Sequence, residues 1–162
     1  MAAFEVRALN QRDAEWVSRF VVDRWGSARM VSRGRVHQVD ALPGFIALQD
    51  DRPAGLTTYQ IEGDQCEMVT LDSLVEGIGI GSALIAAVKD AALRAGCARL
   101  WLLTTNDNMP ALRFYQKRGF VLAALHRNAM EQTRKLKPEV PLIGIDGIPL
   151  RDEIELELEV GG

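Results

Sequence analysis

The chain has 162 residues, a formal net charge of −3 and a pI of about 5.4, with 48% hydrophobic and 25% charged residues. This is ordinary for one globular domain with a buried core. No basic stretch with interleaved aromatic residues predicts a nucleic-acid partner, and no uncharged apolar stretch is long enough for a membrane span. The first residues lack an apolar signal core, so we expect a cytoplasmic protein.

The first half of the chain predicts a strand, a helix and an antiparallel meander. Apolar residues at helical spacing indicate a helix from Gln11 to about Arg24. The segment from Gly26 to Gly44 is polar, and its period is ambiguous. Turn-forming residues then separate short apolar runs, as in strands joined by tight turns. The strands expected in this half cover Phe4–Ala8, Phe45–Gln49, Gly55–Ile61 and Cys66–Leu71.

The second half alternates helices with strands. The run Ala98–Thr104 is nearly all apolar, which is typical of a central strand covered on both faces. The run Ile154–Glu159 alternates apolar and acidic residues, which predicts a last strand with one face in water. The remaining elements are helices from Ile80 to near Gly96, from Asn108 to near Gly119 and from Asn128 to Leu136, and a strand at Phe120–Leu125.

The cysteines and histidines do not form a metal-binding pattern. Cys66 and Cys97 lie in apolar contexts, so we expect reduced core residues rather than a disulfide. His37 and His126 are far apart in sequence and have no Cys or His at ligand spacing. We therefore expect no metal site.

Three glycines alternate with other residues immediately before a helical pattern. They are Gly77, Gly79 and Gly81. Glycine allows a tight turn and a close approach of a ligand to backbone N–H groups, and the start of a helix favours a phosphate. The pattern fits a pyrophosphate-binding turn, although glycines that serve only packing would give the same sequence pattern.

Two motifs follow one another between Glu67 and Phe120. The first is the hexapeptide from Glu76 to Gly81, and the second places an Asn, an Ala, a Phe-Tyr pair and a Gly-Phe pair in fixed order. These residues are Asn108, Ala111, Phe114-Tyr115 and Gly119-Phe120. Together the motifs resemble the GCN5-related N-acetyltransferase (GNAT) superfamily. That family's cofactor motif reads Gln or Arg, two residues, Gly, one residue, then Gly or Ala.

The resemblance implies a fold and an activity. The fold class would be α/β (α+β), with a mixed, mostly antiparallel central sheet of six to seven strands and flanking helices, the acyl-CoA N-acyltransferase fold. It would form a single domain over residues 1–162, with a cofactor-binding core at about 65–125. The activity would be direct transfer of an acetyl group from acetyl-CoA to an amine of a small-molecule or peptide acceptor, and a homodimer is left open.

Two other functions are alternatives to acetyl transfer. A non-catalytic acyl-CoA-binding regulatory module on the same fold would bind the cofactor without turnover. A dinucleotide-binding protein would need a strand–helix–strand unit with its third glycine one residue later than Gly81, so this alternative is disfavoured.

The resemblance also assigns roles to individual residues. Backbone N–H groups of the glycine turn would meet the pyrophosphate, and a strand N–H near Leu71 would stabilise the oxyanion. Tyr115 would protonate the leaving thiolate, or it only packs in the core. Asn108 would contact the cofactor arm, cap its helix, or do both. The cofactor-binding residues expected are Leu71, Gly77, Ile78, Gly79, Ile80, Gly81, Ser82, Asn108 and Tyr115.

Acidic residues raise two open questions. Glu76 stands where the family has an amide or a cation, and its charge would repel a diphosphate unless it points to solvent. By the same resemblance, the base that deprotonates the amine would be Glu67, in the strand before the turn, with Asp72 at the strand end as its rival. Either carboxylate would otherwise be an ordinary solvated group.

The polar segment 25–44 is expected to select the acceptor. Trp25, Arg33 and His37 are the candidate substrate residues. In an extended segment Arg33, Arg35 and His37 would share one face, which would suit an acidic acceptor. The alternative is an exposed polar loop.

Overall fold

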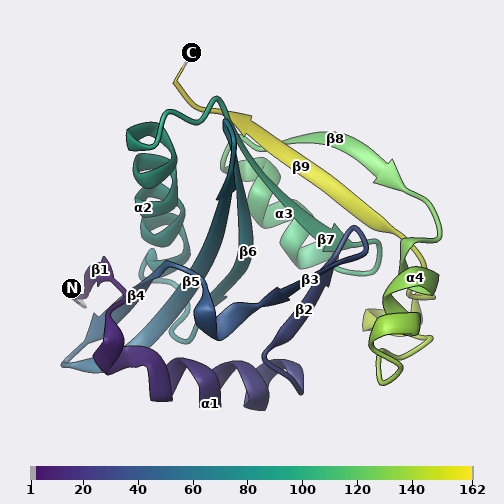
Figure 1. The fold of residues 1–162 in the computed structure, drawn as a ribbon, viewed down its shortest axis with the longest axis horizontal. Helices are drawn as coiled ribbons and strands as arrows, with labels where there is room; N and C mark the ends of the chain where they lie inside the picture. Colours follow the sequence, from purple (N-terminus) through teal and green to yellow (C-terminus); the bar gives the residue numbers. More distant parts are fainter. Residues whose placement is uncertain (1–2, 162) are drawn as a thin grey trace. The chain divides into compact units, whose positions relative to one another are not determined.

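The computed structural model describes residues 3–161 as a mixed α/β fold (Figure 1). Seven strands form a mostly antiparallel sheet in the order β1-β4-β5-β6-β7-β9-β8, and two more form a hairpin. The strands are β1 Glu5–Ala8, β2 Arg29–Ser32, β3 Arg35–Gln38, β4 Gly44–Gln49, β5 Arg52–Glu62, β6 Gln65–Ser73, β7 Arg99–Thr105, β8 Val121–His126 and β9 Glu153–Glu159. The helices are α1 Ala14–Trp25, α2 Ile80–Arg94, α3 Met109–Lys117 and α4 Ala129–Leu136. The predicted fold class is confirmed.

The chain divides into two compact units. The first contains the described residues up to Met30, Gln38–Leu100 and the described residues from Glu159 on, and the second contains Val31–His37 and Trp101–Leu158. The expectation of a single domain over residues 1–162 stays a prediction.

Two apolar clusters hold helices against the meander of the first unit. The strands β4, β5 and β6 pair in antiparallel register, as predicted. Val17 and Val21 of α1 pack with Leu56 of β5. Ile80 and Leu84 of α2 pack instead with Ala47 and Ala54 of β4 and β5. Each helix buries one apolar stripe, as the helical spacing of these residues requires.

A β-bulge interrupts the regular alternation of β6. Thr70 pairs with Thr58 and Met68 with Tyr59, so Val69 is an extra residue. Val69 packs with the α1 cluster and Leu71 with the α2 cluster, although the two are two residues apart. Regular alternation would place Glu67, Val69 and Leu71 on one face, but Val69 and Leu71 pack on opposite faces.

The second unit contains most of β7, together with β9 and β8, and the helices α3 and α4. Trp101 and Leu102 of β7 are buried, as expected for a strand covered on both faces. The expectation of a wet face on β9 is wrong: Glu153 and Glu155 are only 6% and 5% exposed. Alternation predicts a strand correctly, but it cannot tell whether the polar face meets water or other side chains.

The ambiguous polar segment forms a hairpin. The strands β2 and β3 pair across the turn Arg33–Gly34, where both residues have positive φ, 52° and 75°. Positive φ at both central residues is the geometry of a type I′ turn. Its usual sequence signal is Asn-Gly or Asp-Gly, so Arg-Gly did not predict it.

Both cysteines are free and buried, as predicted. Burial raises the pKa of the Cys66 thiol to about 12, and it also raises the pKa of Cys97. A thiol with a raised pKa carries little thiolate at neutral pH and is a poor nucleophile. Within residues 3–161, no helix has the length and apolar character needed to cross a membrane.

Candidate functional site

The glycine turn ends in an uncapped helix start. Gly77 and Gly79 have φ values of 80° and 89°, and Gly79 is the N-cap residue of α2, without a side-chain cap hydrogen bond. A Cβ atom at either position would meet nothing within 4 Å, so the space beside both glycines is open. The first N–H groups of α2 therefore have the orientation that binds an anion.

The remaining residues of the turn have different surroundings. Ile80 is 1% exposed and Gly81 is buried, so only their backbone N–H groups could serve a ligand. Ile78 is half-buried and packs against the α2 cluster, whereas Ser82 is exposed. Gly81 is buried in the first turn of α2 and has no positive φ, so it does not turn the chain.

We expect Gly79→Val to weaken acetyl-CoA binding at least tenfold. A β-branched residue at a φ of 89° costs about 1–3 kcal/mol, and the turn would relax away from its present shape. The control is Gly63→Val, in the β5–β6 turn, where φ is 62° and a Cβ atom is equally uncrowded. Both variants should lose stability in urea unfolding, and only Gly79→Val should lose affinity in calorimetry. Equal affinities would show that the turn does not bind the cofactor.

Glu76 points away from the folded chain. It is exposed and, within the described residues, makes no ion pair or hydrogen bond. This matches the alternative in which Glu76 faces solvent and the backbone makes the anion contacts.

We expect Glu76→Gln to bind acetyl-CoA as well as the wild type, or up to about fivefold more tightly at low salt. An exposed charge beside a diphosphate costs about 1 kcal/mol in water, and salt screens it. Titration calorimetry at low and high salt measures the difference, with Glu15→Gln on α1 as the charge-matched control. A loss of affinity in Glu76→Gln alone would mean that the carboxylate supports the turn.

The bulge in β6 places both candidate bases on one face. Directly paired residues of neighbouring strands point to the same side, and residues two apart in a regular strand do as well. In β5, Gln60 pairs with Glu67 and Leu56 pairs with Asp72. These two partners are an even number of residues apart, so they point to the same side of the sheet. Glu67 and Asp72 therefore share the face on which Leu56 packs with α1. Without the bulge they would lie on opposite faces.

Threonine hydroxyls fix this bulge. Thr57 Oγ1 donates to the Thr70 carbonyl oxygen at 2.7 Å, and the hydroxyls of Thr58 and Thr70 are 2.7 Å apart. The Thr58 N–H also donates to Thr70 Oγ1, at 3.1 Å. All three residues are buried, so these bonds hold β5 and β6 in the shifted register. A Thr-Thr pair is an ordinary strand signal, so the sequence did not reveal this role.

Asp72 is a buried carboxylate with one oxygen that lacks a hydrogen-bond partner among the described residues. It is 4% exposed, and Arg24 Nε lies 3.2 Å from its Oδ1. Its Oδ2 has no hydrogen-bond partner among the residues that the structure describes. Burial raises the pKa of Asp72, and the charge and hydrogen bond of Arg24 and the hydrogen bond of Trp25 oppose this rise. The substrate candidate Trp25 and the rival base thus lie together, at the end of α1. Glu67 is also buried.

Tyr115 and Asn108 have the structural roles that the sequence allowed. The Tyr115 ring makes edge contacts with Phe114 and Phe120, at centroid distances of 5.3 and 5.5 Å. Asn108 caps α3, because its Oδ1 accepts from the Ala111 N–H at 3.2 Å. Their roles toward a cofactor stay predictions.

The acceptor candidates in the hairpin do not share one exposed face. Arg33 lies in the turn, and its Nη1 is 3.5 Å from Glu155 Oε1. His37 is 4% exposed, whereas Arg35 is exposed. The condition for the shared cationic face, an extended run over 33–37, is not met. Because Glu155 already lies close to Arg33, an acidic acceptor has less support than the sequence suggested.

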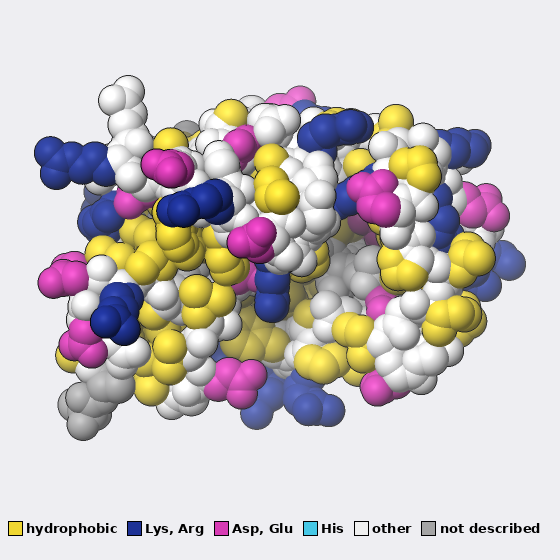
Figure 2. Space-filling model, turned by 90° about the horizontal axis from the view of Figure 1, so that it is seen from below, with side chains coloured by type: hydrophobic (Ala, Val, Ile, Leu, Met, Phe, Trp, Pro, Cys, Tyr) yellow, Lys and Arg dark blue, Asp and Glu magenta, His cyan; other side chains and the backbone are white. Residues whose placement is uncertain are grey.

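Charged side chains of both signs are interleaved on the face shown in Figure 2. Within the described part of the chain, no group of three or more His, Cys, Asp or Glu side chains could hold a metal ion.

Comparison with known proteins agrees with these features. The sequence matches the acetyltransferase (GNAT) family over residues 9–120. It is 45% identical over 145 residues to the uncharacterized protein YxbD of Bacillus subtilis strain 168, covering 89% of this chain and 91% of that protein. A second uncharacterized protein of this strain, YdhI, is 44% identical over 136 residues, covering 83% of this chain and 85% of that protein.

Solved structures share the fold at low identity. An IAA acetyltransferase from Bacillus cereus has a TM-score of 0.76 at 19% identity, with 98% of this chain and all of that chain covered. A GNAT family acetyltransferase from Elizabethkingia anophelis with acetyl-CoA bound has a TM-score of 0.69 at 18% identity, covering 97% and 98%. The family match spans more than half of the sequence, and the chain therefore belongs to the acetyltransferase (GNAT) family.

Proposed function

We propose that this protein is an N-acetyltransferase that uses acetyl-CoA as cosubstrate and acetylates an amine by direct attack. The observation that carries the proposal is the glycine turn, in which two uncrowded glycines lead into the uncapped start of α2. Family membership supports acyl transfer, and the Elizabethkingia anophelis enzyme with acetyl-CoA bound has the same fold. The thioester supplies the activated acetyl group.

Residues of this chain have separate tasks in the proposed reaction. Backbone N–H groups from Gly77 to Ser82 hold the pyrophosphate, and the strand N–H near Leu71 stabilises the developing oxyanion. Tyr115 donates a proton to the leaving thiolate. These assignments follow the motif positions, and the turn geometry supports the first of them.

A carboxylate on the α1 face of β6 takes the proton from the amine. Two observations favour Asp72 over Glu67: its Oδ2 has an unused acceptor position, and burial raises its pKa toward the range of a working base. Arg24 and Trp25 hold the other side of this carboxylate. Glu67 stays the second candidate, on the same face.

The test is an acetyl-transfer assay with a panel of amines, amino acids and N-terminal peptides, read by release of free thiol from acetyl-CoA. The proposal expects turnover with at least one acceptor and an acetylated product of the corresponding mass. Tight binding of acetyl-CoA without turnover across the whole panel would support the non-catalytic acyl-CoA-binding module instead.

A further inference from the structure

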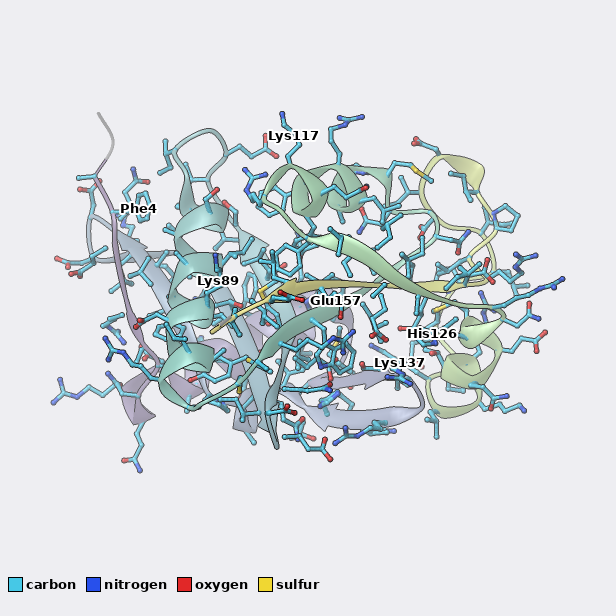
Figure 3. All side chains as sticks on the ribbon, turned by 90° about the horizontal axis from the view of Figure 1, so that it is seen from above. Phe4, Lys89, Lys117, His126, Lys137 and Glu157 are labelled. Carbon is cyan, nitrogen blue, oxygen red and sulfur yellow. The ribbon has the colours of Figure 1, made fainter. Side chains whose placement is uncertain are left out.

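Three acidic residues of β9 lie on one face of that strand. Glu153, Glu155 and Glu157 alternate with apolar residues, and the first two are more than nine-tenths buried. Figure 3 labels Glu157 on β9 and His126 at the end of β8. A buried carboxylate is costly unless a cation or hydrogen-bond donor faces it. The partners of Glu155 therefore show what this face can hold.

Side chains from two other elements lie close to Glu155. His126 Nε2, from β8, lies 2.9 Å from Glu155 Oε1. Arg33 Nη1, from the hairpin turn, lies 3.5 Å from the same oxygen. A charge-assisted hydrogen bond between these groups would be about 2.7–2.9 Å long, so the arginine contact is loose. Half of the Arg33 side chain remains exposed, at 49%, whereas the Glu155 side chain is 7% exposed.

The guanidinium of Arg33 also lies over an aromatic ring. Its Cζ is 6.0 Å from the centroid of the Trp101 ring, and Trp101 is 8% exposed on β7. An aromatic face beside a carboxylate is the combination that binds organic cations, because the ring quadrupole and the negative charge both attract them. Arg33 reaches this place from a turn in which its own φ is 52°, a conformation that disfavours a residue with a side chain.

We infer that Trp101 and Glu155, with His126 beside them, form a binding site for an organic cation, a guanidinium or a primary ammonium, which Arg33 fills when no ligand is bound. The tight partner of Glu155 is His126, and the loose, half-exposed partner is Arg33. A ligand cation displaces the Arg33 guanidinium and takes over its contacts with the Trp101 ring and the Glu155 carboxylate. One part of this inference rests on the proposed function: if the protein acetylates an amine, the site implies that this acceptor is a cationic molecule rather than an acidic one.

Calorimetric titration with three small probes of similar size tests the site without acetyl-CoA. The probes are butylguanidinium, butylammonium and butyrate. We expect the two cations to bind and butyrate not to bind. Arg33→Ala should tighten cation binding about tenfold, because the competing guanidinium is gone, and Glu155→Gln should weaken it about tenfold or more. Arg35→Ala on the same hairpin and Glu159→Gln on the same strand are the matched controls, expected to leave the affinity unchanged.

The outcomes separate this inference from the proposed function. Binding of butyrate that Arg33→Ala abolishes would overturn the cation site and restore Arg33 as a recogniser of acidic ligands. Cation binding that Arg33→Ala leaves unchanged or weakens would also overturn it. Should Glu155→Gln fail to fold, Arg33→Ala at the exposed turn still decides the result. The affinity for acetyl-CoA, titrated separately in the same variants, should stay constant. If the wild type did not bind acetyl-CoA, only the proposed function would be contradicted.

Discussion

Tyr115→Phe is expected to lower kcat about 10²–10⁴-fold, the usual effect of losing a positioned general acid. The ring stays in place, so its edge contacts with Phe114 and Phe120 and the packing of α3 should survive. Because the proton is needed in the transition state and not in the ground state, the Kd for acetyl-CoA should stay nearly constant. The measurement is thiol release with an accepted amine, alongside calorimetric titration of acetyl-CoA.

Tyr59→Phe is the matched control, since it removes the hydroxyl of the other tyrosine, whose ring stacks on Phe45 in the first unit. This variant should keep the wild-type kcat. If Tyr115→Phe also keeps full kcat under conditions where chemistry limits turnover, Tyr115 only packs in the core. Water or another group must then protonate the thiolate.

Asp72→Asn is expected to lower kcat/KM about 10²–10⁴-fold if Asp72 accepts the proton of the amine. Glu67→Gln, on the same face of β6, is the matched variant and should keep most of the activity. Both variants should be folded and should bind acetyl-CoA as the wild type does. The reverse pattern, with the loss confined to Glu67→Gln, would assign the base to Glu67.

Asp72→Asn should also change the pH dependence of the free energy of unfolding. Burial raises the pKa of Asp72 in the folded state above its unfolded value, so the folded state holds its proton more tightly. The free energy of unfolding therefore falls as pH rises from the unfolded pKa to the folded one, and stays lower above it. Asparagine does not ionise, so the stability of Asp72→Asn relative to the wild type should be higher at pH 7 than at pH 4 in urea unfolding. The opposite sign would mean that the ion pair with Arg24 outweighs burial.

Local patterns predicted most elements of the fold because each pattern has one physical cause. The apolar stripe of α2 and the continuous apolar run of β7 correspond to a helix with one covered face and a strand with two. Gly79 was identified as a turn residue from the residues around it, and its positive φ confirms that. These features depend on neighbours in sequence, which a single sequence displays.

Features that depend on distant residues could not be predicted in this way. The bulge at Val69 arises from pairing with β5, and it decides which face Glu67 occupies. Glu155 is buried where His126 of β8 and Arg33 of the hairpin lie close to it, although its alternating pattern suggested a wet face. The pairing of Arg24 with Asp72 joins residues 48 positions apart. In each case the partner is set by tertiary structure.

The central claim is that the glycine turn binds acetyl-CoA, and a thermal-unfolding comparison of acetyl-CoA with NAD and ATP tests it most directly. A ligand at a hundred times its Kd adds about 2.7 kcal/mol to the free energy of unfolding, which is a readily measured rise in Tm. We predict that acetyl-CoA raises the Tm of the wild type, that NAD and ATP do not, and that Gly79→Val loses most of the acetyl-CoA effect. An unchanged Tm at millimolar acetyl-CoA, in both the wild type and Glu76→Gln, would contradict the account.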